Sequence, residues 1–165
     1  MKHGFTLIEL LVVIAIVGLL STIVVASVSR VRQTAMITKT NAEINQFIKL
    51  ATLAQGESGR ALGNITGSGC SDCGCRARDI RNIPTSDSCY IQWVNILNLT
   101  KTASLNMLPG IEKMYRDPWG SPYCLDENEG EYAGAVDTFR SVGPDGTWGT
   151  GDDISYYIPR SGKYP

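Results

Sequence analysis

The stretch Gly4–Val13, GFTLIELLVV, opens an apolar run that continues to Val28 and carries a single charge, Glu9. As an α-helix rising about 1.5 Å per residue, the run from Phe5 to Val28 would be about 36 Å long, enough to cross a hydrocarbon core of roughly 30 Å. A carboxylate near the bilayer centre costs about 2.5 to 3.5 kcal/mol and is usually paired and functional. The sequence therefore predicts a membrane-length helix in which Glu9 has a specific role.

Two simple interpretations of this run stay open at this point. A cleavable secretory signal would end before Ser27, because Val24-Val25-Ala26 gives a small-residue pattern. The apolar stretch is, however, longer than the roughly 7 to 15 residues of such signals, and it contains a charge. A plain membrane anchor explains the length but leaves Glu9 with no purpose beyond reaching toward the membrane surface.

A third interpretation accounts for every feature of the N-terminus. The segment Met1–Gly4, followed by Phe5-Thr6-Leu7-Ile8-Glu9, closely resembles the N-terminus of type IV pilins and of the major pseudopilins of type II secretion. This resemblance implies that a prepilin peptidase cleaves between Gly4 and Phe5, that the new N-terminus is methylated, and that the chain polymerises with copies of itself. Glu9 would then meet the Phe5 ammonium of a neighbour, and the penalty on an unpaired charge would fix the assembly register.

The same resemblance implies a location and a set of partners. The precursor is expected as a single-pass protein of the inner membrane, and the assembled filament is expected in the periplasm or outside the cell. The partners would be copies of the chain, the prepilin peptidase, and an inner-membrane assembly platform with minor pilins. The alternative is a major or minor type IV pilin for DNA uptake, adhesion or motility. The only visible basic cluster in the sequence that could bind nucleic acid is Arg76, Arg78 and Arg81. The net charge of −1 gives no general support for nucleic-acid binding.

Hydrophobic periodicity divides the chain into a long helix and a head. We expect a leader peptide at 1–4, a transmembrane or filament-core helix at 5–28, the amphipathic half of the same helix at 29–55, and a globular head at 56–165. Within the head, residues 61–88 read as a Cys-rich variable surface loop, because glycine, serine and cysteine abound there without periodicity. Residues 115–165 read as short strands, tight turns and an acidic loop.

The remaining elements of the head are short. Cys89–Leu99 predicts an amphipathic helix whose inward residues are Ile91, Trp93, Val94 and Leu97. Strands are expected at Tyr123–Leu125, Thr138–Val142 and Ile154–Ile158. A helix first and a small antiparallel sheet last is an α+β pattern, and the resemblance specifies it further as a pilin fold.

Five cysteines lie in the expected head, at Cys70, Cys73, Cys75, Cys89 and Cys124. The C-x2-C spacing of the first two could hold zinc with two further sulfurs. A head that lies beyond a membrane anchor is instead in a compartment where disulfides form and persist, and this favours disulfides. Two bridges and one thiol are the simplest count, and the connectivity stays open.

Acidic residues gather near the C-terminus, with eight carboxylates and one arginine in residues 126–153. Asp145, Asp152 and Asp153 lie there in a glycine-rich loop, and calcium takes roughly six to eight oxygens from such flexible chain. The spacing is not that of an EF-hand, and an acidic glycine-rich turn is more often simply solvated. The residues alone therefore leave both possibilities open.

A second resemblance favours calcium. The segments DPWGSPY at Asp117–Tyr123, SVGPDG at Ser141–Gly146 and GDD at Gly151–Asp153 look like the C-terminal signature of the major pseudopilins. The resemblance implies that the side chains of Asp145, Asp152 and Asp153 and the carbonyl of Val142 bind Ca²⁺, with Thr147 and Ser155 as weaker candidates. We expect Trp119 in a core or interface, and Trp148 exposed on the loop.

The sequence gives no support for catalysis. Its single histidine is His3, and it contains no nucleophile–base set and no glycine-rich phosphate loop. We therefore expect a structural subunit without catalytic residues rather than an enzyme.

Overall fold

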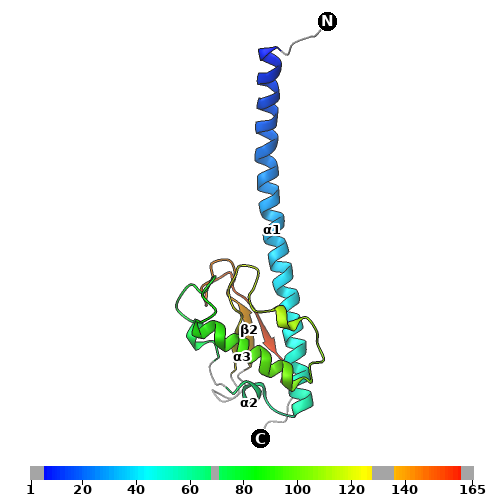
Figure 1. Ribbon diagram of the computed structural model, residues 1–165, viewed down its shortest axis with the longest axis vertical. Helices are drawn as coiled ribbons and strands as arrows, with labels where there is room; N and C mark the ends of the chain where they lie inside the picture. Colours follow the sequence, from blue (N-terminus) through cyan, green and yellow to red (C-terminus); the bar gives the residue numbers. More distant parts are fainter. Residues whose placement is uncertain (1–5, 68–70, 128–135, 161–165) are drawn as a thin grey trace. The chain divides into compact units, whose positions relative to one another are not determined.

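The structure is a computed structural model that describes residues 6–67, 71–127 and 136–160, without the side chains of residues 23 and 26. Gly4, Phe5 and Cys70 thus lie outside the described residues. The chain divides into two compact units, residues 1–37 and 38–165. Helix α1, Leu7–Ser58, belongs to both units (Figure 1).

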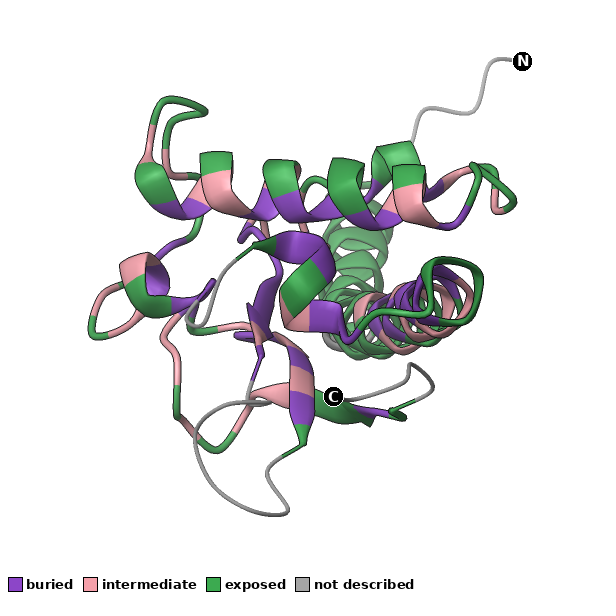
Figure 2. Cartoon of the chain, turned by 90° about the horizontal axis from the view of Figure 1, so that it is seen from below, coloured by how far each residue is buried: buried purple, intermediate pink, exposed green. Residues whose placement is uncertain are grey.

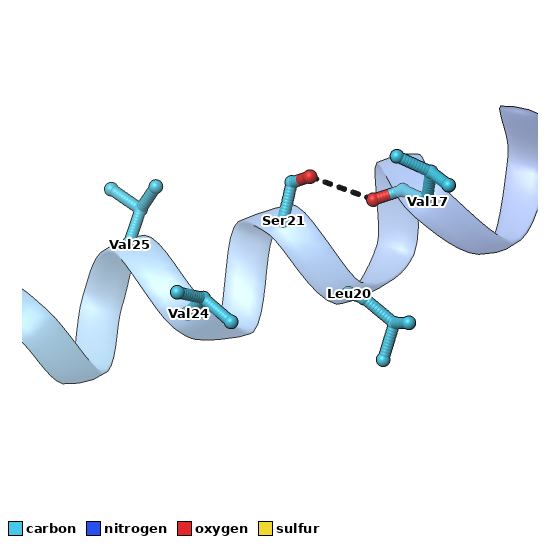
Figure 3. Close-up of a pocket in the computed structure, with 5 residues that line it drawn as sticks. All are labelled: Val17, Leu20, Ser21, Val24 and Val25. Atoms are coloured by element: carbon cyan, nitrogen blue, oxygen red, sulfur yellow. Dashed lines mark hydrogen bonds between the residues drawn. The ribbon is translucent and has the colours of Figure 1, made fainter.

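The first unit consists of the apolar half of α1, which continues through Gly18 without a break. Its large apolar side chains are exposed, as shown by Leu7 at 80% and Leu19 at 69%. Figure 3 shows a shallow apolar surface on this helix, where the Ser21 hydroxyl donates to the Val17 carbonyl over 2.7 Å. The hydroxyl is thus satisfied inside the helix, as an apolar environment requires. Among the described residues α1 is the one helix long and apolar enough to cross a membrane, a property that a signal sequence shares.

The second unit is an α+β head, as predicted. Its elements after α1 are helices α2 (Leu62–Thr66) and α3 (Ser88–Ala103), the short 3-10 turns η1 (Cys73–Cys75) and η2 (Ile111–Lys113), and the strands β1 (Cys124–Asp126), β2 (Asp137–Ser141) and β3 (Ile154–Ile158). The strands form one antiparallel sheet in the order β1-β2-β3. The predicted strands are correct, with β1 and β2 shifted by one residue and β3 matched at both ends.

The core of the head forms around Phe139 of β2. Its ring lies 4.1 Å from that of Phe47 on α1 and 5.2 Å from that of Trp93 on α3, measured between centroids. A strand side chain points to one face only, so both helices pack against the same face of the sheet. The Trp93 indole donates to the Met114 carbonyl over 2.7 Å, which satisfies its buried N–H.

Helix α3 begins at an N-cap and buries one face. The Asp87 side chain accepts from the Cys89 backbone N–H over 2.9 Å, and this satisfies one free donor of the first turn. Trp93 and Leu97 are buried as expected, but the prediction for Ile91 was wrong, since 54% of it is exposed. Two residues turn a helix by about 200°, so Ile91 faces away when Trp93 faces inward. In Figure 2 the buried residues of this helix lie on the side that faces the sheet.

The Cys-rich segment is only partly a surface loop, and the prediction for 61–88 needs this correction. Leu62 and Ile80 in it are fully buried. Ile80 belongs to a second core cluster, which we call the cystine cluster; its buried members are Cys75, Ile80, Cys89, Cys124 and Val142. Periodicity missed these positions because each comes from a different turn or element and not from one regular face.

Trp148 was predicted to be exposed, and this was wrong. It is half-buried and packs against the cystine cluster. The guanidinium carbons of Arg76 and Arg140 lie 4.8 Å and 4.7 Å from its ring centroid. Two cation–π contacts therefore hold this tryptophan against the head and not out in solvent.

Candidate functional site: the helix start and the acidic loop

Glu9 has a partner inside its own chain. The Thr6 backbone N–H and hydroxyl both donate to Glu9 Oε2, over 2.9 Å and 2.8 Å, and the Glu9 N–H donates back to the Thr6 hydroxyl over 3.3 Å. This reciprocal arrangement is a capping box, and its T-x-x-E pattern is visible in the sequence. Glu9 therefore has a partner only three residues away in its own chain. The cleavage site between Gly4 and Phe5 lies outside the described residues.

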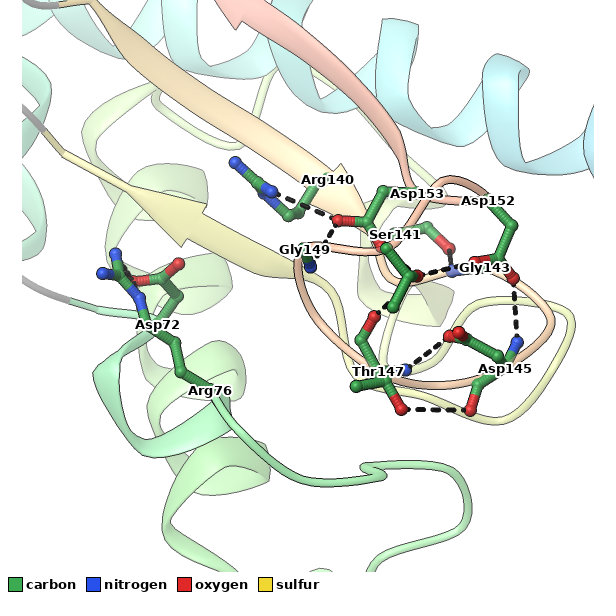
Figure 4. Close-up of polar contacts among 11 residues, drawn as sticks. Asp72, Arg76, Arg140, Ser141, Gly143, Asp145, Thr147, Gly149, Asp152 and Asp153 are labelled. Carbon is green, nitrogen blue, oxygen red and sulfur yellow. Dashed lines mark hydrogen bonds and ion pairs between the residues drawn. The ribbon is translucent and has the colours of Figure 1, made fainter.

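The acidic loop, residues 142–153, joins β2 to β3 and closes on itself (Figure 4). The Asp145 N–H donates to Asp152 Oδ2 over 3.0 Å, so two of the expected calcium ligands lie together. A Cβ atom at Gly143, where φ is +68°, would lie 2.3 Å from the Asp152 carbonyl oxygen. Only glycine permits this close approach, so Gly143 is needed to bring the two ends of the loop together.

Each carboxylate of the acidic loop accepts hydrogen bonds from the loop itself. Asp145 accepts from the Thr147 N–H over 2.8 Å, and Asp152 accepts from the Thr150 hydroxyl over 2.6 Å. The Thr150 bond is the main reason why the pKa of Asp152 lies below its usual value. The loop thus stabilises the negative charge of these carboxylates with its own backbone and hydroxyl donors.

Asp153 points toward Arg140. Its Oδ2 lies 3.3 Å from Nη1 of that arginine and also accepts from the Gly149 N–H over 2.8 Å (Figure 4). Within the described part of the chain, no three side chains of the types His, Cys, Asp or Glu are grouped as a metal site. The oxygen chemistry of Asp145, Asp152, Asp153 and the Val142 carbonyl nevertheless fits a hard cation. Binding one would require the carboxylates to give up part of these local hydrogen bonds.

Asp117 links the DPWG turn to the acidic loop. Its Oδ1 accepts from the N–H groups of Trp119 and Ser121 over 3.0 Å and 2.9 Å, while its Oδ2 accepts from the Ser141 hydroxyl over 2.6 Å. The same hydroxyl accepts from the Gly143 N–H over 3.2 Å. Burial raises the pKa of Asp117, although these hydrogen bonds oppose the rise. The two parts of the C-terminal signature are therefore joined by one buried carboxylate.

The segment 79–82 borders the acidic loop from the other side. Asp79 and Thr147 form an antiparallel bridge, and the Ile80 N–H donates to the Gly146 carbonyl over 2.9 Å. Arg81 Nη1 donates to the Pro144 carbonyl over 2.9 Å. Sequence reasoning missed this contact, because more than sixty residues separate the partners and neither segment has regular periodicity.

Of the cysteines in the described residues, Cys73, Cys75 and Cys89 form disulfides, as favoured over zinc. Cys75 and Cys89 are bridged, with their Cα atoms 5.0 Å apart, and Cys73 is disulfide-bonded as well. These sulfurs are therefore not thiolates available to zinc. Cys124 is a buried free thiol, whose pKa is raised by burial, so it is a poor nucleophile.

The arginines proposed for nucleic acid all pair with carboxylates. Arg76 lies 2.7 Å from Asp72, Arg78 lies 2.6 Å from Asp87, and Arg81 lies 2.6 Å from Asp79; these are nitrogen–oxygen distances. The cluster is thus neutralised locally and offers little net positive charge for a phosphate backbone.

Comparison with known proteins connects both regions to one family. Residues 1–25 match the family described as the prokaryotic N-terminal methylation motif. The chain is also 31% identical, over 155 residues, to the type II secretion system core protein G of Escherichia coli (strain K12). That match covers 93% of this chain and 90% of the relative. The search of solved structures gave no significant match. The chain therefore belongs to the family of type II secretion pseudopilins related to core protein G.

Proposed function

We propose that this chain is a structural subunit of a type II secretion pseudopilus and not an enzyme. The observation that carries the proposal is the likeness to core protein G, which extends over nearly the whole chain and includes the acidic loop. The exposed apolar half of α1 supports it, because such a surface needs either lipid or copies of itself around it. The precursor would be anchored in the inner membrane by this half-helix.

Processing would precede assembly. A prepilin peptidase would cleave between Gly4 and Phe5, and the new amine would be methylated, as the match at residues 1–25 suggests. Glu9 would then exchange its intrachain bonds with Thr6 for the Phe5 ammonium of a neighbouring subunit. An unpaired charge in an apolar filament core is strongly unfavourable, so this exchange would select one register. The assembly platform and minor pilins would be the further partners.

The acidic loop would bind calcium through the carboxylates of Asp145, Asp152 and Asp153 and the Val142 carbonyl. Bound calcium would supply the positive charge that offsets the repulsion among these carboxylates. Asp145 and Asp152 are already adjacent through their hydrogen bond, and Arg140 keeps Asp153 at the edge of the loop. Calcium that binds the folded head but not the unfolded chain would stabilise the folded head, and would thereby favour the assembled form.

The test is the intact mass and N-terminal sequence of the protein from its native membrane, with imaging of sheared surface material. We expect a chain that starts at methylated Phe5, and filaments that contain it. Gly4→Ala tests processing directly, and Gly63→Ala in α2 serves as the control glycine variant outside the leader. A chain that begins at Ser27 would overturn the proposal, because the apolar helix would then be a discarded signal.

A further inference from the structure

Arg81 contributes a positive charge to the acidic loop, although it is not among the expected calcium ligands. Its Nη1 donates to the Pro144 carbonyl over 2.9 Å, immediately before Asp145 in the sequence. Its Nε and Nη2 hold the Asp79 carboxylate, with 2.6 Å between Nη2 and Oδ2. The guanidinium fork thus joins the acidic loop to the segment 79–82 by contacts on two of its edges.

The backbone beneath Arg81 allows this close approach. Gly146 has φ of +71°, and a Cβ atom there would lie 2.4 Å from Arg81 Cγ and 2.3 Å from Asp79 Oδ1. Next to it, the Ile80 N–H donates to the Gly146 carbonyl, and the Ile80 side chain is fully buried in the cystine cluster. The arginine is therefore placed by a rigid neighbour and not by a free loop.

Three carboxylates act on the charge of Arg81. Asp79 holds the guanidinium by hydrogen bonds, and the charges of Asp145 and Asp152 act on it at longer range; all three raise its pKa. Asp145 and Asp152 are two of the carboxylates whose repulsion calcium would relieve. A fixed arginine beside them relieves part of the same repulsion at all times.

We propose that Arg81 is a positioning residue that holds the acidic loop closed before any metal ion binds, by joining the Pro144 carbonyl to Asp79 and by supplying a positive charge near Asp145 and Asp152. The loop would then be preorganised for calcium, and calcium would complete a closed loop instead of ordering an open one. The calcium part of this inference rests on the proposed function, but the closing of the metal-free loop does not.

The experiment measures amide hydrogen exchange of the full-length protein in detergent micelles, in chelator and in saturating calcium. In chelator, we expect residues 143–150 and Ile80 to exchange about fivefold faster in Arg81→Gln than in the wild type, the size typical of an exposed ion pair. Calcium should restore most of the protection. Lys49→Gln is the matched control, because it removes one positive charge from an exposed position on α1.

Equal exchange of wild type and Arg81→Gln in chelator would overturn the inference, and so would an equal acceleration in Lys49→Gln. If Arg81→Gln also accelerates exchange in α3, the substitution has unfolded the head. The exchange rates of Arg81→Lys in chelator then test the inference in its place. The lysine keeps the charge but cannot hold both partners, so faster exchange in the loop alone supports the inference, and unchanged exchange overturns it. If calcium slows exchange in neither the variant nor the wild type, the proposed calcium site is wrong. The exchange rates measured in chelator still test the role of Arg81, because they do not depend on calcium.

Discussion

Asp117 is nearly fully buried, yet three donors reach its carboxylate from the DPWG turn and from Ser141. A buried carboxylate is stable only when its oxygens are paired, and removing it leaves those donors unsatisfied. The acidic loop depends on this residue, since the Ser141 hydroxyl that Asp117 holds also accepts from Gly143. A side chain that lies 24 residues before Ser141 in the chain therefore supports the loop that carries the expected calcium ligands.

We expect Asp117→Ala to lower the free energy of unfolding by about 3 kcal/mol, because it leaves two backbone N–H groups and one hydroxyl unpaired. Asp117→Asn keeps an acceptor oxygen and the shape, so it should cost much less. Urea unfolding of both variants and of Ser141→Ala measures this. Equal losses for the alanine and asparagine variants would show that the hydrogen bonds are not the cause.

The raised pKa of Asp117 has a consequence for the pH dependence of stability. The unfolded state releases the proton near the ordinary aspartate pKa of 3.8, whereas the folded state holds it to higher pH. The stability contributed by the protonated carboxyl is thus fully present below pH 3.8 and is lost as pH rises through the folded pKa. The stability of the wild type minus that of Asp117→Asn should fall over this window, then level off. A difference that rises with pH would contradict the raised pKa of Asp117.

The capping box at the start of α1 gives a second test on single residues. Thr6→Val keeps the side-chain shape but removes the hydroxyl that exchanges hydrogen bonds with Glu9. We expect hydrogen exchange at residues 7–10 of the precursor to be about fivefold faster, since the first turn loses its cap. Thr6→Ser should behave like the wild type. Equal exchange in all three proteins would mean that Glu9 does not depend on Thr6.

Among the elements, the 3-10 turn η1 and the start of α3 are fixed to each other by a covalent bond. Cys75 and Cys89 are separated by 14 residues and lie together in the cystine cluster. Ile80, between them in sequence, carries the hydrogen bond to Gly146 of the acidic loop. The disulfide therefore restrains the segment on which the acidic loop rests.

We expect the double variant Cys75→Ala, Cys89→Ala to lose about 3 kcal/mol of unfolding free energy, the value for a closed loop of about 15 residues. Hydrogen exchange at residues 143–150 should rise with it, because Ile80 is less well held. Cys124→Ala is the control, since it removes a sulfur from the same cluster without opening a bridge. A comparable effect of Cys124→Ala on the acidic loop would assign the result to packing alone.

At the scale of the whole molecule, calcium should stabilise the head. At a calcium concentration of about 100 times Kd, binding adds about 2.7 kcal/mol, or roughly 5 to 10 °C in Tm for a chain of this size. Calorimetry in calcium and in chelator measures the shift. Asp145→Asn with Asp152→Asn should abolish it, whereas Glu112→Gln, at an exposed position outside the loop, should leave it unchanged. The same Tm with and without calcium in the wild type would remove the calcium proposal.

The two units of the chain differ in how far sequence reasoning could describe them. The position of the apolar half of α1 follows from hydropathy alone, because a helix that is apolar on every face needs an apolar environment along its whole length. Strand positions in the head were also predicted, since apolar alternation and turn residues are local signals. The roles of Ile91 and Trp148 were not, because burial on a short helix or a loop depends on which neighbours are present.

By itself, the sequence determined the long helix, the motif around Glu9, the order of elements in the head and the group of carboxylates near the C-terminus. These features depend on residues that lie close together in the chain, so periodicity and motif spacing report them. Only the tertiary structure decided that Arg140 holds Asp153 and that Arg81 reaches Pro144. The last contact joins segments 63 residues apart, and the hydrogen-bond geometry that selects one partner among many exists only once the core has placed both segments.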